Sequence, residues 1–112
     1  MTLQEIIDRL DLKVLTEPKD FHSLHPASGY ASDLLSCVMA GAKQHGIWVT
    51  LQAHTNIVAV AALLELTAVI ITENAQPDQA TISKANQEEI TLLSTENSSF
   101  TIIGQLWEMG LR

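Results

Sequence analysis

The chain has 112 residues, which is enough for one domain with a buried core, and we expect residues 1–112 to form a single domain. Thirteen acidic against six basic residues give a formal charge of -7, which repels nucleic-acid backbones and anionic membrane surfaces. Apolar residues make up 46% of the chain but aromatic residues only 4%, so its core must consist of small aliphatic side chains, as in helices packed on a buried sheet.

The chain shows no signal for export or for membrane insertion. Its single cysteine, Cys37, has no partner for an internal disulfide, and residues 1–13 lack the basic start and continuous apolar run of a signal peptide. The longest apolar run, residues 57–64, is much shorter than the ~20 residues that cross a bilayer. We therefore expect a cytoplasmic protein that binds neither membranes nor nucleic acid.

The first thirty residues predict one helix and two strands. Thr2, followed three residues later by Glu5, forms a capping-box pattern that starts a helix ending at about Leu10. The segment LKVLT, residues 12–16, predicts a strand. Residues 21–24 predict a second short strand, with a loop behind it that contains Pro26 and Gly29.

The next segment predicts a helix between two polar boundaries. Ser32 is the expected N-cap, Asp33 lies at the positive end of the helix dipole, and Gly46 is expected to end the helix.

From Ile47 onward, strands and helices alternate in the predicted order. The expected strands cover residues 47–52, 68–72 and 90–95, and the expected helices cover 55–66, 77–89 and a segment from Asn97 or Ser98 to Gly110. We expect the last helix to turn Phe100, Ile103 and Leu106 inward. Alternation of this kind predicts parallel strands joined by right-handed crossovers, so the fold should be a three-layer α/β/α sandwich with a mostly parallel sheet.

The helix predicted over residues 55–66 is apolar on every side. One face carries Ile57, Val60, Ala61 and Leu64, and Glu65 is the only charged residue. Two explanations remain open: other elements of the same chain cover both faces, or a second copy covers the outer face in a homodimer. The dimer-interface candidates are Val58, Ala59, Ala62 and Leu66.

No motif in the chain predicts a catalytic centre or a cofactor. The segment GAKQHG, residues 41–46, has the glycine spacing of a phosphate-binding loop, but Ile47 and Trp48 replace the required lysine and hydroxyl residue. The segment also begins inside a predicted helix, so it indicates a helix end and no P-loop kinase. Without a Cys-x-x-Cys pair, the histidines and cysteine predict no metal site: His22, His25, Cys37, His45 and His54.

Polar residues follow three of the predicted strands. In open α/β sheets, ligands bind beyond the carboxyl ends of the strands, so these residues could form a binding site if the strands are neighbours. The ligand-binding candidates are Tyr30, Gln52, His54, Asn56, Thr72 and Ser94. The alternative is that such residues only cap helices and make turns, and Thr55 or Asn56 is the expected cap of the helix over 55–66.

Four segments together resemble the DRTGG-domain family, in particular small stand-alone members found beside regulatory and redox genes in anaerobic bacteria. They are GYASDLLSCVMAGA (29–42), IWVTLQAHTNIVAVAALLEL (47–66), AVIIT (68–72) and ITLLSTENSSFTIIGQLWEMGL (90–111). The resemblance implies a fold similar to the amino-terminal domain of HPr kinase/phosphorylase, with related modules in some phosphotransacetylases and CBS-domain pyrophosphatases. It reaches only the non-catalytic domain of the kinase, so it implies a self-associating regulatory module and no kinase activity.

The chain departs from the family pattern after residue Thr72. The family usually has a glycine pair there, whereas this chain has Glu73 and Asn74. Glycines permit positive φ and close approach of a ligand, and a carboxylate would repel phosphate, so an anion-binding role is weakened. Asn74 can still adopt the left-handed conformation that the turn requires.

These observations predict a non-enzymatic regulatory or scaffolding domain that forms a homodimer and modulates a partner enzyme or regulatory protein. The alternative is a small-molecule sensor that binds a nucleotide or a phosphorylated metabolite at the strand ends. A third hypothesis, an accessory to a serine kinase, has the least support from the residues.

Overall fold

The computed structural model describes residues 1–112, which form five strands and five α-helices. The strands are β1 (Lys13–Val14), β2 (Gly29–Ala31), β3 (Ile47–Thr50), β4 (Ala68–Ile71) and β5 (Thr91–Ser94). The helices are α1 (Leu3–Leu10), α2 (Leu35–Gly41), α3 (Asn56–Leu63), α4 (Gln79–Gln87) and α5 (Ser99–Glu108), with a 3₁₀ turn η1 (Phe21–Ser23) before β2. None of these helices is both long enough and apolar enough to cross a membrane.

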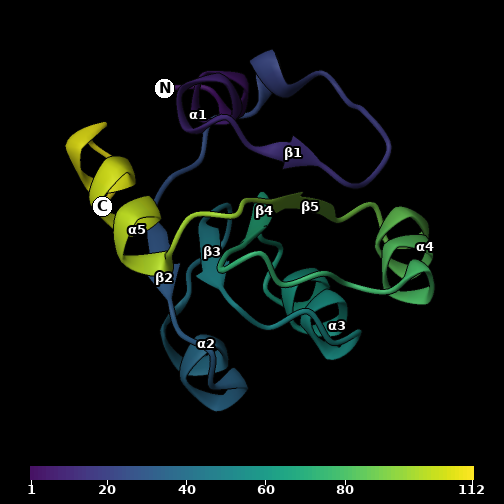
Figure 1. The fold of residues 1–112 in the computed structure, drawn as a ribbon. Coiled ribbons are helices and arrows are strands. Elements are labelled where there is room, and N and C mark those ends of the chain that lie inside the picture. Colours follow the sequence, from purple (N-terminus) through teal and green to yellow (C-terminus); the bar gives the residue numbers. More distant parts are fainter.

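The strands form one sheet in the order β1-β5-β4-β3-β2 (Figure 1). Strands β2 to β5 pair in parallel, and β1 pairs antiparallel with β5. Every residue of β3, β4 and β5 is buried, as expected for parallel strands covered by helices on both faces. The predicted mostly parallel sheet is confirmed.

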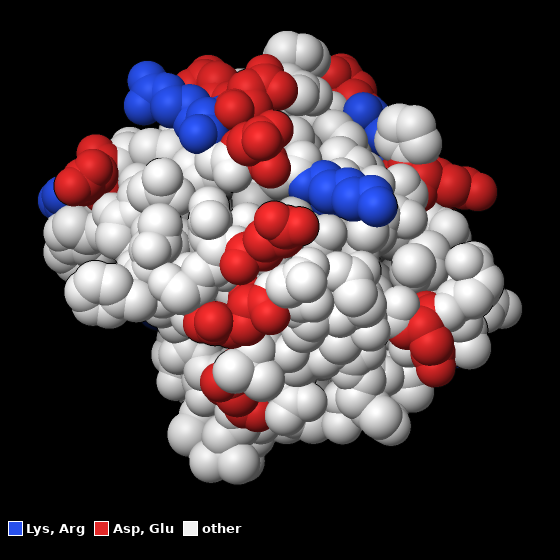
Figure 2. Space-filling view, in the orientation of Figure 1, with Lys and Arg blue, Asp and Glu red and all other residues white.

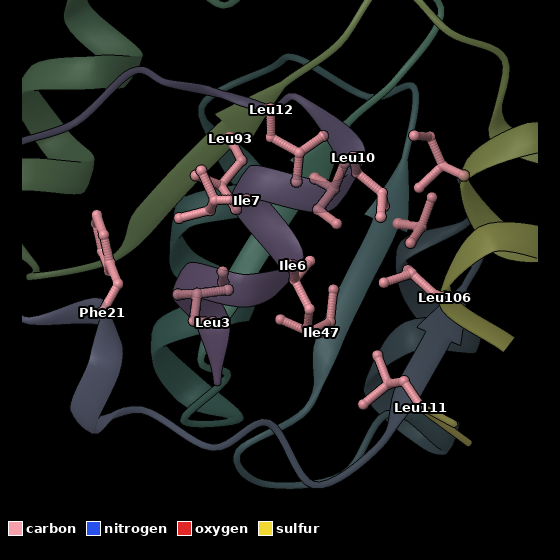
Figure 3. Packing of buried hydrophobic residues seen from close by; sticks show 14 residues of the cluster. Leu3, Ile6, Ile7, Leu10, Leu12, Phe21, Ile47, Leu93, Leu106 and Leu111 are labelled. Atoms are coloured by element: carbon pink, nitrogen blue, oxygen red, sulfur yellow. The ribbon is translucent and has the colours of Figure 1, made fainter. Parts of the chain in front are cut away.

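Helices cover both faces of the sheet. On one face, α1 and α5 pack on a core cluster that includes Ile47, Ile70 and Leu93 (Figure 3). On the other face, α2, α3 and α4 pack on a second cluster that includes Trp48, Val69 and Leu92. The predicted three-layer α/β/α sandwich is therefore confirmed.

Three helices begin at polar side chains that accept a backbone hydrogen bond. Thr2 Oγ1 accepts from the Glu5 N–H of α1 at 3.1 Å, and Ser98 Oγ accepts from the Thr101 N–H of α5 at 3.2 Å. Both caps follow the sequence prediction. In the same way, Asp78 starts α4.

The predicted strand over residues 21–24 is wrong. Asp20 accepts a hydrogen bond from the His22 N–H and so caps the 3₁₀ turn η1, while Phe21 is buried in the layer of α1. The strand beside β3 is Gly29–Ala31, where the sequence predicts a loop. Its pairing partner, β3, lies later in the chain, so local alternation gave no sign of it.

Helix α2 begins later and ends earlier than predicted. Ser32 Oγ accepts a hydrogen bond from the Leu34 N–H in a turn, but it does not cap the helix, whose first residue is Leu35. The helix ends at Gly41, five residues before Gly46. The segment 41–46 thus joins a helix end to β3, whereas a phosphate-binding loop follows a strand.

Helix α5 turns Leu106 inward as predicted, but it does not turn Phe100 and Ile103 inward. Ile102 and Leu106 are buried, whereas Phe100 and Ile103 are exposed. Residues two apart in a helix point in nearly opposite directions, so once Ile102 faces the sheet, Phe100 must face away from it.

Candidate functional site

The carboxyl ends of β3, β4 and β5 lie side by side, because these strands are neighbours in the sheet. The polar residues that follow the three strands therefore share one edge of the molecule. Their contacts show how the loops at this edge are held and which side chains remain available to a ligand.

Asp33 joins the loop after β2 to the end of β3. Its carboxylate accepts hydrogen bonds from Thr50 Oγ1 and from the Leu51 N–H, both at 2.8 Å. Gln52, a ligand-binding candidate, donates from Nε2 to the Asp33 backbone oxygen at 3.1 Å. Asp33 was expected to complement the dipole of α2; instead it fixes the β3 loop, and Gln52 is part of the same arrangement.

Thr72 joins β4 to both β3 and α5. It is fully buried, and its hydroxyl donates to the Thr50 backbone oxygen at 3.3 Å. The same hydroxyl lies 2.5 Å from the Ser99 hydroxyl at the start of α5. Thr72 therefore holds loops together and does not face an open site.

Glu73 and Asn74 form a left-handed turn directly after β4 and Thr72. Their φ angles are 62° and 57°, and their amides donate to the backbone oxygens of Asn97 and Thr95. The turn predicted for this position is present, although neither residue is glycine.

The carboxylate of Glu73 lies at the amino end of α5. It accepts a hydrogen bond of 2.8 Å from the Ser99 N–H, one of the first amides of the helix. A helix amino end favours negative charge, and here a side chain of the protein supplies it. An external phosphate would have to displace this carboxylate or stay close to it.

His54 starts α3 in place of the residues predicted to do so. Its Nδ1 accepts a hydrogen bond from the Asn56 N–H at 3.2 Å, whereas Thr55 at the cap position makes no side-chain bond to the helix. Asn56 is exposed. His54 was predicted as a ligand contact, but this nitrogen is used inside the protein.

Asp78, at the start of α4, has an altered acidity. The Thr81 N–H donates to the Asp78 carboxylate at 2.8 Å, and this bond, together with one from the Thr81 hydroxyl, holds the pKa of Asp78 below its ordinary value of 3.8. The nearby His54 lowers the pKa further, by a smaller amount. The carboxylate is therefore ionised over the whole neutral range.

Tyr30 lies in β2 and packs on α2. A Cβ added at Gly41 would collide with the Tyr30 ring, so the glycine is what admits the ring to this position. The side chain contributes to the core cluster on the side of α2, α3 and α4. Tyr30 does not line the hollow between β5 and the β4–α4 loop.

A hollow at this edge has a volume of about 340 Å³ and lies between β5, the β4–α4 loop and the junction of α1 with β1. It is lined by Leu10, Asp11, Lys13, Asn74, Gln76, Ser94, Thr95, Glu96 and Asn97. Ser94 is the only predicted ligand candidate among them. The other lining residues were missed because the hollow depends on β1 pairing antiparallel with β5, which no local pattern in the chain indicates.

The histidines and Cys37 are spread over the molecule. No three metal-ligating side chains come together as a group that could hold a metal ion. Cys37 is exposed on α2.

The predicted dimer interface on α3 lies only partly at the surface. Val58 and Leu66 are buried by the chain itself, so they have almost no exposed area to offer a partner. Ala59 is exposed and Ala62 is partly exposed. Other elements of the same chain therefore cover most of this apolar helix, as the first of the two explanations states.

Comparison with known proteins shows what this fold is similar to. No family model matches the chain, and no curated protein matches it. Among solved structures, it is similar to the crystal structure of the CBS and DRTGG domains of the regulatory region of Clostridium perfringens pyrophosphatase, complexed with the activator diadenosine tetraphosphate. The TM-score is 0.74 at 19% sequence identity, over 92% of this chain and 44% of that one, so the chain spans less than half of that structure. The likeness shows a DRTGG-like fold.

Proposed function

We propose that this chain is a regulatory domain of the DRTGG type that modulates a partner enzyme and associates with a second copy of itself. The observation that carries the proposal is the structural likeness, which extends over 92% of the chain to the regulatory region of an enzyme. A domain of this kind acts by changing what its partner does, and it has no need of a catalytic group of its own.

The hydrogen bonds at the carboxyl edge of the sheet support a regulatory role. Asp33 holds Thr50, the Thr50 backbone holds Thr72, and Thr72 with Glu73 holds the start of α5 at Ser99. These contacts form a continuous path from the loop after β2 to α5. A ligand or partner that shifts one of these loops would also move the helix at the far end of the path.

The hollow of about 340 Å³ favours a second candidate function, that of a small-molecule sensor. Its volume lies at the lower end of the ~300–1,000 Å³ typical of ligand pockets. The amide and hydroxyl groups around it suit the hydrogen-bonding groups of a nucleoside. Asp11 and Glu96 oppose the single lysine, Lys13, so the phosphates of a nucleotide would have to point out of the hollow into solvent.

A thermal-shift screen tests the sensor function. Nucleosides, nucleotides, diadenosine tetraphosphate and phosphorylated metabolites would each be titrated against the full chain. A ligand at a hundred times its dissociation constant adds ~2.7 kcal/mol of stability, a rise of roughly 10 °C or more in the unfolding midpoint of a domain this size. Asn97→Ala in the hollow should abolish the shift, and the exposed Gln87→Ala on α4 should leave it unchanged.

An activity assay tests the regulatory function. The enzyme encoded beside the gene would be assayed with and without an equimolar amount of the chain. We expect a change in kcat or KM of that enzyme, and no phosphate transfer when the chain alone is incubated with ATP and acceptor proteins. Robust phosphate transfer by the chain would overturn the assignment and favour a kinase function.

A further inference from the structure

The outer face of α5 carries large apolar side chains that the chain leaves partly or largely exposed. Phe100 is 88% exposed, Trp107 is 57% exposed and Ile103, between them, is 39% exposed. Ile103 follows Phe100 by three residues and Trp107 follows it by seven. All three side chains therefore point to nearly the same side of the helix. We call Phe100, Ile103, Gly104 and Trp107 the α5 stripe.

Gly104 lies in the middle of this stripe, and its presence has no explanation within the chain. It is exposed in a helix interior, and a Cβ built on it would meet no atom within 4 Å. Glycine is less favourable than alanine inside a helix, and here no neighbouring element requires its small size. The missing side chain leaves a notch between Phe100 and Trp107 into which another helix could project a side chain.

The stripe is complementary to a second copy of itself. Consider two α5 helices that run antiparallel, with a two-fold axis passing between residues 103 and 104. Phe100 then lies opposite the partner's Trp107, and Ile103 lies opposite the partner's Gly104. In this arrangement, each aromatic side chain contacts an aromatic side chain of the partner, and each Ile103 fits into the notch at the partner's Gly104. The two-fold symmetry makes each of these contacts occur twice.

Charge also favours a second copy at this surface. Acidic residues outnumber basic ones on the face shown in Figure 2, whereas the left side, over α5, is uncharged apart from acidic and basic side chains at its outer edge. Arg112 stacks over the Trp107 ring at 4.6 Å, near the end of α5, and the exposed Glu96 precedes its start. In the antiparallel pair, Arg112 of each copy comes near Glu96 of the other, so opposite charges meet at both ends of the stripe.

The exposed aromatic side chains supply part of the area that a dimer interface needs. Aromatic side chains of this size bury ~150–250 Å² each, so Phe100 and Trp107 at their observed exposures supply roughly 300 Å². The smallest stable interfaces bury ~600 Å² on each partner. The two aromatic residues thus provide about half of this area, and the other half must come from Ile103 and the polar residues beside the stripe.

We propose that the chain forms a two-fold symmetric dimer through α5, with the two helices crossing antiparallel at Gly104. This inference deepens the self-association that forms part of the proposed function, and it assigns that association to α5 instead of α3. Because α5 also receives the hydrogen bonds of Thr72 and Glu73 at its start, the dimer would be linked to the loops around the hollow.

Sedimentation velocity on the full chain tests this inference. We expect a dimer at high micromolar concentration, and Ile103→Glu should weaken association at least a hundredfold by placing unpaired charge in the interface. The matched control is Leu63→Glu on α3, which changes a residue that is 67% exposed and should leave the dimer intact.

Two further variants exclude loss of folding as the cause. Gly104→Ala should raise the unfolding midpoint of the monomer at low concentration and yet weaken the dimer about tenfold, because the notch is filled. Glu96→Arg should weaken association, and the double variant Glu96→Arg with Arg112→Glu should restore it.

Specific outcomes would overturn the inference. If Leu63→Glu dissociates the protein and Ile103→Glu does not, the dimer forms through α3. If the wild-type chain sediments as a monomer at every concentration, no dimer forms, while regulation of a partner enzyme stays testable by the enzyme assay. If Gly104→Ala leaves the dimer unchanged, the helices do not cross at the notch.

Discussion

Helices α3 and α5 show that apolar composition and apolar exposure are different properties. Helix α3 is the most apolar helix in the sequence, yet it contacts both α2 and α4 and lies on the sheet, so these neighbours cover most of it. Helix α5 contacts α1 and the sheet, and its outer face, with two large aromatic residues, remains open. The position of a helix among its neighbours decides whether its apolar residues need a partner.

The largest difference between the two helices should appear on introducing charge. Val58→Asp in α3 would place a carboxylate in a fully buried position without a partner, and we expect a loss of ~4 kcal/mol or more in unfolding free energy. Phe100→Asp in α5 should change the stability of the monomer by no more than ~0.5 kcal/mol.

Urea unfolding at low micromolar concentration, where the monomer dominates, would measure both variants. Equal losses of stability would contradict the distinction between a covered and an open helix. A stable Val58→Asp variant would show that α3 has a solvated face after all.

A second contrast concerns two glycines in helices. Gly41→Ala in α2 should destabilise the protein by ~1–3 kcal/mol, because the new methyl group collides with the Tyr30 ring. Gly104→Ala in α5 should stabilise the monomer by up to ~1 kcal/mol, since the methyl group meets only solvent there. Thermal unfolding of both variants checks the opposite signs; a loss of stability in both would show that α5 is covered within the monomer.

Glu73 tests how α5 is attached to the sheet. Glu73→Ala should cost ~1–2 kcal/mol, because it removes a charged hydrogen bond to the Ser99 N–H and leaves residue 73 at positive φ. Glu73→Gly loses the same hydrogen bond, but glycine adopts positive φ without strain. The stability of this variant should therefore be closer to that of the wild type. Denaturant unfolding of the pair separates the two effects; identical losses would mean that the positive φ carries no cost.

Substitution of Asp78 should have the smallest effect on stability, and this effect should be visible only when the pH is varied. Its folded pKa lies below the ordinary value of 3.8, so it stabilises the fold above that pH and loses this contribution as pH falls toward the folded pKa. Asp78→Asn keeps a capping side chain without the charge, and it should therefore reduce the fall in the unfolding midpoint as pH drops from neutral to below 3.8. Unchanged acid sensitivity would contradict this role.

Local patterns in the sequence predicted most of the fold. The fully buried strands β3 to β5 were recognised from continuous apolar runs, and α1 and α5 from polar caps at Thr2 and Ser98. The three-layer architecture followed from their alternation. These features depend on residues that are neighbours in the chain, which is why the sequence alone predicts them.

What the sequence could not reveal depends on pairing between distant segments. β2 was missed because its partner β3 comes later in the chain, and the hollow was missed because β1 returns antiparallel beside β5. Leu106 was correctly assigned to the inward face of α5, but Phe100 and Ile103 were not, because the rotation of a helix on a sheet is set by packing. The candidates Thr72 and Gln52 were correctly placed at the strand ends, but their hydrogen bonds tie the loops together.

Acrylamide quenching of tryptophan fluorescence as a function of protein concentration tests the central claim most directly. The chain has two tryptophans: Trp48 is fully buried in the core, and Trp107 lies in the α5 stripe. At low micromolar concentration, we expect one protected and one readily quenched tryptophan, and at high micromolar concentration both should be protected, in step with the dimer seen by sedimentation. If Trp107 remains readily quenched in a protein that sediments as a dimer, α5 does not form the interface.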